Sequence, residues 1–154
     1  MKRLILVLVL LWPASLLADF QAGFDAYGRG DYATAYWEWL PLAEQGDAKA
    51  QFNIGALYDF GWGVPKDDAV AAQWYRLAAA QGDVEAQFNL ALMYQYGEGV
   101  PQDYMQAYAW LNIAATQGNK NAANNRDVMQ RRMTPDQVAE GEKLSRELFE
   151  RMKK

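Results

Sequence analysis

Cysteine, histidine and serine carry much of the nucleophilic and acid–base chemistry that proteins perform. The chain has no cysteine and no histidine among its 154 residues, and Ser145 is its one serine beyond residue 18. Without a thiol or an imidazole, the sequence excludes disulfide frameworks, zinc sites built from Cys and His, and serine nucleophiles activated by histidine. Ser145 falls in a charged segment, so we expect no catalytic role for it.

Carboxylates are plentiful, and their positions indicate structural roles. Asp67 and Asp68 precede a predicted helix, where an acidic residue caps the N-terminus and interacts favourably with the helix dipole. A glycosidase-type pair needs one carboxyl group in an apolar cleft, and no spacing in the sequence indicates one. Gly61-Trp62-Gly63 follows a predicted helix rather than a strand, so it is not a phosphate loop. We therefore expect no catalytic residue, no metal and no cofactor.

Aromatic and amide side chains remain as candidates for ligand recognition, and a repeat in the sequence positions them. Residues 48–83 and 84–119 are identical at sixteen of 36 positions without a gap. Self-similarity at a fixed period of this length is typical of a solenoid. The sequence therefore predicts a stack of similar units rather than a single irregular core.

Each unit predicts two helices. Ala50, Ile54 and Leu57 share one helical stripe. Gly61 allows the left-handed turn that ends the first helix, and Pro65 prevents that helix from resuming.

The second helix of each unit is expected to begin after a capping aspartate. Asp67 and Asp103 occupy this position in the two units, and Gly82 closes the first of these helices. Trp74 and Trp110 lie on the predicted buried stripe, so we expect them to fill the space between layers.

Less regular units flank the two full ones, as expected of terminal repeats. Residues 20–47 form a degenerate unit with a shorter turn, and residues 120–133 form a partial unit in which Arg126 replaces the apolar residue found at Ile54. Residues 134–154 predict a capping helix, because Thr134 and Gln137 form a capping box. Its apolar residues are expected to cover the open end of the stack.

The first eighteen residues predict a secretory signal peptide. Lys2 and Arg3 precede an apolar run from Leu4 to Trp12, which is too short to span a bilayer as a helix. Cleavage after Ala18 would leave residues 19–154 without a stable membrane anchor. We therefore expect a periplasmic or secreted bacterial protein.

The charge of the expected mature chain is uneven. Residues 19–119 hold 4 basic and 13 acidic side chains, whereas residues 120–154 hold 9 basic and 6 acidic ones. An acidic body disfavours nucleic acid as a partner, because binding there depends on neutralising phosphates.

The repeat motif resembles the Sel-one-like repeat (SLR) family, a relative of the tetratricopeptide repeat. The resemblance rests on the shared pattern Y-x-x-G-x-G-V-P-x-D, which runs from Tyr58 to Asp67 and again from Tyr94 to Asp103. It implies an all-α fold, a short right-handed α-solenoid of antiparallel helix pairs, and a role in binding another protein or a peptide segment. We expect a monomer, with self-association through the exposed ends of the short stack as an alternative.

Helical geometry places a second set of residues opposite the buried stripe of each first helix, at about 100° per residue. In tetratricopeptide relatives, ligand-contacting positions fall at the same offset from the glycine that matches Gly55. This face combines aromatic, amide and charged groups, which suits an extended peptide or a partner helix. The residues predicted to bind a partner are Lys49, Phe52, Asn53, Asp59, Phe60, Glu85, Phe88, Asn89, Gln95, Tyr96, Asn124, Asn125 and Arg131.

Three features of this face have a structural alternative. Phe52 and Phe88 could pack against a neighbouring unit. The repeated asparagines Asn53, Asn89 and Asn125 could bond an adjacent loop rather than a ligand. Trp62, which replaces the repeat's Glu98, is either a lid over its own core or an exposed contact.

The sequence therefore predicts a non-catalytic periplasmic adaptor or scaffold that holds a partner segment in its concave groove. One alternative is an inhibitor or immunity protein for a toxic enzyme. Another is an enzyme that acts on the cell wall or on β-lactams, since cysteine-rich relatives have been linked to penicillin. Those units are stapled by disulfides, whereas this chain has no cysteine.

Overall fold

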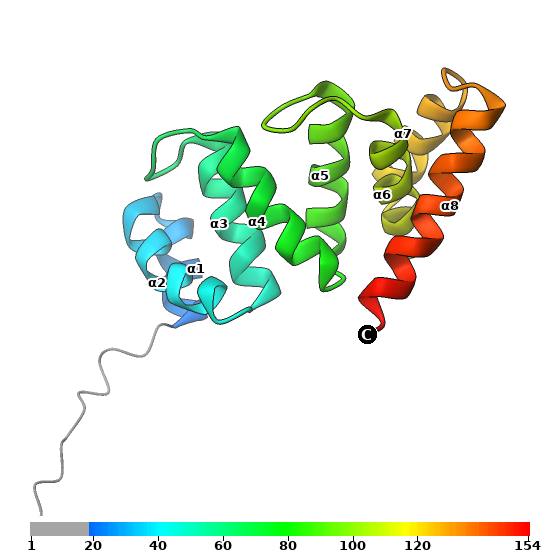
Figure 1. The fold of residues 1–154 in the computed structure, drawn as a ribbon. Helices are drawn as coiled ribbons and strands as arrows, with labels where there is room; N and C mark the ends of the chain where they lie inside the picture. The colour runs from blue at the N-terminus through cyan, green and yellow to red at the C-terminus, as the bar shows by residue number, and fades with distance from the viewer. Residues whose placement is uncertain (1–18) are drawn as a thin grey trace, which may run out of the picture.

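The computed structural model describes residues 19–154, so the predicted signal peptide lies outside the described residues. The described chain is all-α and contains no strand. Its eight helices run in order along an elongated stack (Figure 1). They are α1 (Phe20–Gly28), α2 (Tyr32–Glu44), α3 (Ala48–Phe60), α4 (Asp68–Ala80), α5 (Val84–Tyr96), α6 (Tyr104–Thr116), α7 (Lys120–Gln130) and α8 (Pro135–Met152).

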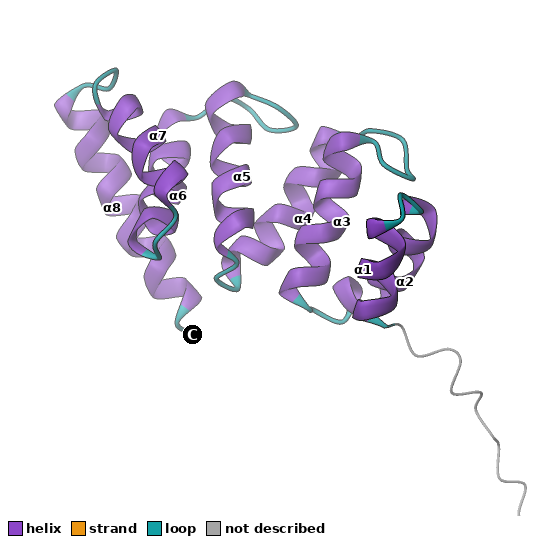
Figure 2. Ribbon diagram, turned by 180° about the vertical axis from the view of Figure 1, so that it is seen from behind, coloured by secondary structure: helices purple, strands orange, loops and turns teal. Residues whose placement is uncertain are grey.

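The helices form a solenoid in which each of α1 to α7 packs against its neighbours in the chain. We call α1, α3, α5 and α7 the first helices and α2, α4 and α6 the second helices of their units. The first helices lie nearer the viewer when the molecule is seen from behind (Figure 2). The 36-residue period of the sequence is thus the period of the stack. Among residues 19–154, no helix is long and apolar enough to cross a membrane.

The helix boundaries follow the capping residues of the sequence. The side chains of Asp67 and Asp103 accept hydrogen bonds from the first turns of α4 and α6, as predicted. Gly61 ends α3 in a left-handed conformation with φ of 68°. Thr134 and Gln137 form the predicted capping box at the start of α8.

The two helices of a unit meet where an aromatic residue fills the space above a glycine. The ring of Tyr75 lies against Gly55, where an added Cβ would be 2.8 Å from the ring. Trp39 lies against Gly23 in the same way. The expectation for Trp74 holds in part: Tyr75 is the fully buried aromatic of α4, whereas Trp74 is half-buried and packs against the core formed by α1, α2 and α3. Trp110, its counterpart on α6, is buried as predicted.

Glycine-rich loops connect each unit to the one before it. Gly63 lies on the backbone at the start of α2, so a Cβ there would be 2.6 Å from the carbonyl carbon of Tyr32. Gly99 lies on the start of α4 in the same manner, against the backbone of Asp68 and Ala69. The second glycine of each loop is therefore required by close approach as well as by its positive φ.

A buried glutamine links each full unit to the preceding one. The Gln51 amide donates to the Ala43 carbonyl, and that of Gln87 donates to the Ala79 carbonyl at 3.2 Å. The side-chain oxygen of each glutamine accepts a second bond at the end of its own unit, with Gln117 donating to Gln87 at 2.8 Å. Sequence analysis did not single out these residues, although Gln51 and Gln87 are identical across the repeat.

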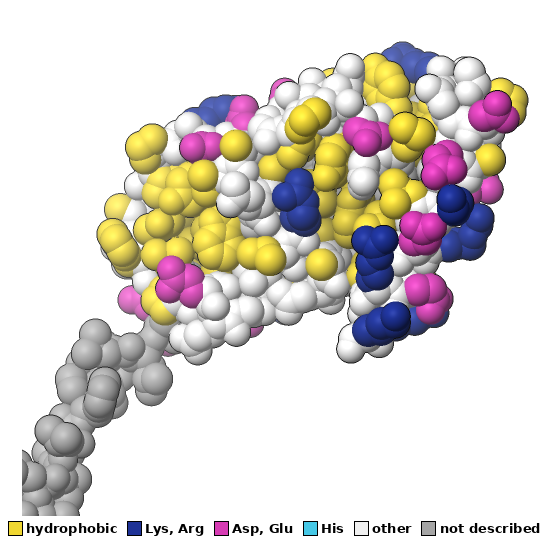
Figure 3. Space-filling view, viewed as in Figure 1, with side chains coloured by type: hydrophobic (Ala, Val, Ile, Leu, Met, Phe, Trp, Pro, Cys, Tyr) yellow, Lys and Arg dark blue, Asp and Glu magenta, His cyan; other side chains and the backbone are white. Residues whose placement is uncertain are grey.

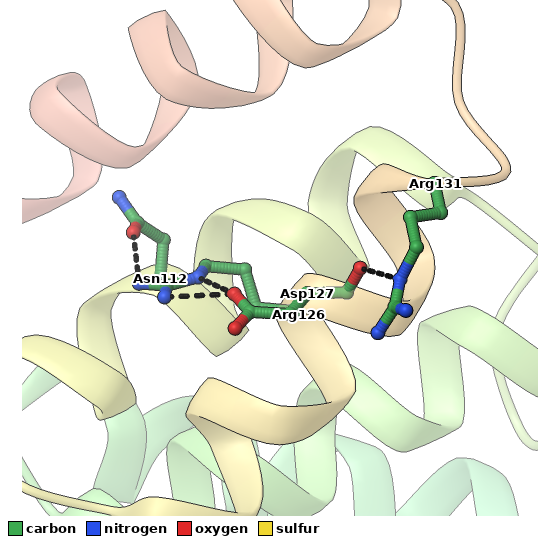
Figure 4. Close-up of polar contacts among 4 residues, drawn as sticks. All are labelled: Asn112, Arg126, Asp127 and Arg131. Atoms are coloured by element: carbon green, nitrogen blue, oxygen red, sulfur yellow. Dashed lines mark hydrogen bonds and ion pairs between the residues drawn. The ribbon is translucent and has the colours of Figure 1, made fainter.

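The last helix packs on α6, with which it shares most of its contacts, rather than on α7. It lies at the end of the stack, where it was expected, but it packs on α6 (Figure 1). The reason lies in α7, where Arg126 takes the place of an apolar residue. Its guanidinium donates to the Asn112 side chain at 3.3 Å and pairs with Asp127 (Figure 4). Because α7 lacks a continuous apolar stripe, α8 covers the apolar outer side of α6 instead.

Candidate functional site

A hollow of about 240 Å³ lies on the first-helix side of the stack, and we call it the first-helix groove. Its lining comes from the helices α1, α2, α3 and α5 and from the loop after α3. Its lining residues are Phe24, Tyr27, Trp39, Phe52, Asn53, Ala56, Phe60, Trp62 and Asn89. Six of these nine side chains are aromatic, so the groove is an apolar surface with amide groups at its margin.

The aromatic wall of the groove is held in place by ring stacking. Trp62 stacks on Phe60 with a centroid distance of 4.6 Å and on Tyr32 with a distance of 5.1 Å. These contacts answer the question that the sequence left open. Trp62 covers the core formed by α1, α2 and α3, and it also lines the groove.

Two large apolar side chains on this side remain open to solvent. Phe24 is 56% exposed and Phe60 is 57% exposed. Isolated exposed aromatics are common, but here both belong to one hollow. Exposed apolar side chains that gather in one patch often mark a site of interaction with another molecule.

The amides at the margin are partly committed to the fold. The Tyr75 hydroxyl donates to the Asp59 carboxylate at 3.1 Å, and the Asn89 side chain lies close to this hydroxyl. Burial raises the pKa of Tyr75 above its ordinary value, and the neighbouring Asp59 charge acts in the same direction. Asn89 therefore lies beside a residue of α4 rather than bonding an adjacent loop, and Asp59 orients the buried tyrosine rather than facing the hollow.

The two repeated phenylalanines differ in their surroundings. Phe52 is half-buried, lies 5.7 Å from the Tyr75 ring between centroids, and lines the groove. Phe88 packs against the core that spans α4 to α7, and it does not line the groove. The structural alternative therefore describes Phe88, whereas Phe52 supports the fold and contributes groove surface.

The structure brings Phe52, Asn53, Phe60 and Asn89 together in the groove. Gln95 and Tyr96 line a separate hollow of about 300 Å³ beside α7. Glu85 accepts a bond from Asn119, and the Arg131 guanidinium donates to the Asp127 carbonyl oxygen (Figure 4). The predicted residues that line neither hollow are Lys49, Asp59, Glu85, Phe88, Asn124, Asn125 and Arg131.

Sequence analysis missed the groove residues of the first unit, which are Phe24, Tyr27 and Trp39. The turn between α1 and α2 is shorter than the loops of the full units. The 36-residue spacing that located the other residues therefore does not extend to α1. In the sequence, the aromatic residue type at position 24 was the one available signal for these groove residues.

The one serine of residues 19–154 bonds a neighbouring helix. The Ser145 hydroxyl is buried and accepts a hydrogen bond from Asn112 at 3.0 Å. Within residues 19–154, no three acidic side chains gather as a group that could hold a metal ion. The arrangement on the first-helix side fits the insertion of an apolar side chain from a ligand.

The comparisons with known proteins agree with this architecture. The family model described as Sel1 repeat matches residues 48–83 and 84–119. A protective antigen present in uropathogenic Escherichia coli strains, which displays an SLR fold, is similar with a TM-score of 0.81 and 35% identity. That match covers 84% of this chain and 29% of the other.

A Sel1 repeat protein from Oxalobacter formigenes is also similar, with a TM-score of 0.64 and 38% identity. The match covers 68% of this chain and 32% of that one. This chain thus spans less than a third of the length of either relative. No curated protein matches the sequence significantly.

Proposed function

We infer the function from the family, because this chain belongs to the Sel1-repeat proteins by its two tandem repeats and its SLR fold. Sel1 repeats generally mediate protein–protein interaction, and their fold generally serves as a non-catalytic scaffold. We propose that this chain is a periplasmic adaptor that holds a segment of another protein in the first-helix groove.

One observation supports the groove more than any other: two exposed phenylalanines, Phe24 and Phe60, flank a single aromatic hollow. A partner that places one large apolar side chain between them removes apolar surface of both molecules from water. Such burial contributes about 25 cal/mol per Å². The Asn53 amide at the margin is positioned to bond the backbone of the partner segment.

The solenoid keeps the first-helix groove rigid. Trp62 is stacked on both Phe60 and Tyr32, so one wall of the groove spans two units. A preformed wall lowers the entropy that is lost when a partner binds. Binding would therefore be passive, without a large change in the shape of the solenoid.

The periplasmic location rests on the predicted signal peptide. We expect protein recovered from the periplasm of an expressing bacterium to begin at Asp19, because cleavage after Ala18 removes the basic and apolar leader. N-terminal sequencing of that protein checks this. A chain that retains Met1 would contradict the proposed export.

The binding proposal is tested by affinity capture from an envelope extract with three forms of the protein. One is unchanged, one carries Phe24→Ala and Phe60→Ala, and a matched control carries Tyr104→Ala and Phe149→Ala, which are exposed elsewhere. We expect the same partner with the unchanged and control proteins, and its loss with the groove variant. A partner held equally by all three would place binding outside the groove.

A further inference from the structure

The second-helix side of the molecule carries an apolar surface that is separate from the first-helix groove. Hydrophobic side chains gather over α2 and α4 in the view of Figure 3. Trp37 on α2 is 69% exposed, and Leu77 on α4 is 50% exposed. We call the side of a second helix that points away from the first helices its outer face.

The same face is covered on α6, and α8 is the element that covers it. Ile113 and Trp110 are 1% and 4% exposed, and Leu148 and Met152 of α8 pack against the core to which they belong. The residues 36 positions earlier are Leu77 and half-buried Trp74 on α4. The fold therefore contains one example of an amphipathic helix on this face. On α4 the equivalent face has only the C-terminal end of α8 beside it.

A polar contact sets the register of α8 on α6. The Asn112 amide donates to the Ser145 hydroxyl at 3.0 Å, and Ser145 is buried in the contact. The residue equivalent to Asn112 on α4 is Arg76. Suppose that a helix packs on α4 as α8 packs on α6. The residue of that helix equivalent to Ser145 would then lie beside the guanidinium of Arg76.

The charge of Arg76 is available to such a partner. It donates to the Tyr94 hydroxyl at 3.2 Å, and within residues 19–154 it forms no ion pair. Arg76 and Arg151 both line a hollow of about 310 Å³ between α4 and α8, whose floor includes Trp110 and Met152. Figure 3 shows basic side chains on both sides of this hollow. A carboxylate is the group that complements an arginine best, because it accepts two parallel hydrogen bonds.

We propose that the outer face of α4 is a second docking site, whose occupant is an amphipathic helix of a partner protein with a carboxylate facing Arg76. The apolar stripe of that helix packs on Trp74, Leu77 and Ala80, as α8 packs on α6. An Asp or Glu at the position equivalent to Ser145 pairs with Arg76. This site is independent of the first-helix groove, so either can be present without the other.

The test uses the chain's own capping helix as a probe for the equivalent face. Three fluorescent peptides carry residues 134–154 with Ser145 unchanged, Ser145→Glu or Ser145→Lys. Their binding to the purified protein is measured by anisotropy. Charged hydrogen bonds contribute more than neutral ones, so we expect the Ser145→Glu peptide to bind at least about tenfold tighter than the unchanged one.

Protein variants locate the bound peptide. Arg76→Glu should invert the preference in favour of the Ser145→Lys peptide, and Leu77→Asp should weaken all three peptides. Both residues are exposed, and unchanged circular dichroism verifies that the variants fold. Phe60→Ala, in the first-helix groove, should leave every affinity unchanged.

Three results would overturn the proposal. One is equal or undetectable binding of the three peptides. Another is a preference that survives Arg76→Glu, as expected if the peptide displaces α8 from α6. The third is a loss of binding with Phe60→Ala, which would place the peptide in the groove. None of these results contradicts the proposed function, which concerns the other side of the stack.

Discussion

Single side chains in this molecule hold the repeats in register, and the buried glutamines illustrate how. Gln87 is fully buried and bonds both the Ala79 carbonyl and the Gln117 amide. Gln87→Met keeps the length of the side chain but leaves these partners without a bond. We expect the free energy of unfolding to fall by about 1–3 kcal/mol, the cost of a buried polar group left unpaired.

Urea unfolding checks this expectation, with Gln73→Met as the matched control. Gln73 is exposed on α4, and substitutions at such positions usually change stability by less than about 0.5 kcal/mol. Equal losses for Gln73→Met and Gln87→Met would show that the buried bonds contribute nothing measurable.

A pair of tyrosines makes stability sensitive to alkaline pH. The hydroxyls of Tyr36 and Tyr58 lie 3.2 Å apart. This hydrogen bond, together with burial, raises the pKa of Tyr36 from 10.0 to about 12. The unfolded chain therefore releases this proton at lower pH than the folded chain, and the free energy of unfolding decreases as pH rises from 10 towards 12.

Urea midpoints measured across this range should fall more steeply for the unchanged protein than for Tyr36→Phe, which lacks the titrating group. Burial also raises the pKa of Tyr75 and Tyr108, so some alkaline loss should remain in the variant. Identical slopes would contradict the assignment of the raised pKa to Tyr36.

At the scale of elements, the glycine loops connect successive units. Gly99 and Gly118 both have positive φ, of 67° and 98°. A Cβ at Gly99 would overlap the backbone of Asp68 and Ala69, whereas a Cβ at Gly118 meets nothing within 4 Å. Gly118→Ala should therefore lower the free energy of unfolding by only about 1–2 kcal/mol, the energy needed to hold alanine in the left-handed conformation.

Gly99→Ala should cost clearly more than Gly118→Ala, because the loop must also move off the start of α4. Thermal or urea unfolding of the two variants measures the difference. If the two substitutions destabilise the protein equally, the loop does not depend on close approach to α4.

The helices themselves were predictable from local rules. Aspartate caps, left-handed glycines and the 36-residue period located α3 to α6 and the start of α8. The helix on which α8 packs was not predictable. It depends on the outer face of α6 being more apolar than α7, which carries Arg126 in place of an apolar residue. Nor was the role of Tyr75, since its fit above Gly55 depends on how two helices cross.

The candidate site was predicted in part, for the same reason. A helical wheel locates the side of a helix, so Phe52, Asn53, Phe60 and Asn89 were placed together. It cannot show which side chains a neighbouring helix covers, as happens at Phe88, or that Asp59 bonds the Tyr75 hydroxyl. The residues of α1 were missed because the first unit departs from the period.

At the scale of the whole molecule, the two faces of the stack have different characters. The first-helix side offers an aromatic hollow, and the second-helix side offers an apolar helix face with two arginines nearby. A scaffold with two surfaces of this kind can hold two partners at once. The proposed function places a partner segment in the first of these surfaces.

Photo-crosslinking in an expressing bacterium tests that claim most directly. A photoreactive phenylalanine analogue replaces Phe60 in one protein and Phe149, which is 39% exposed on α8, in another. We predict a crosslink to one envelope protein from position 60, its loss when Phe24→Ala is added, and no such crosslink from position 149. The absence of a crosslink from position 60, or the same crosslink from both positions, would contradict groove binding.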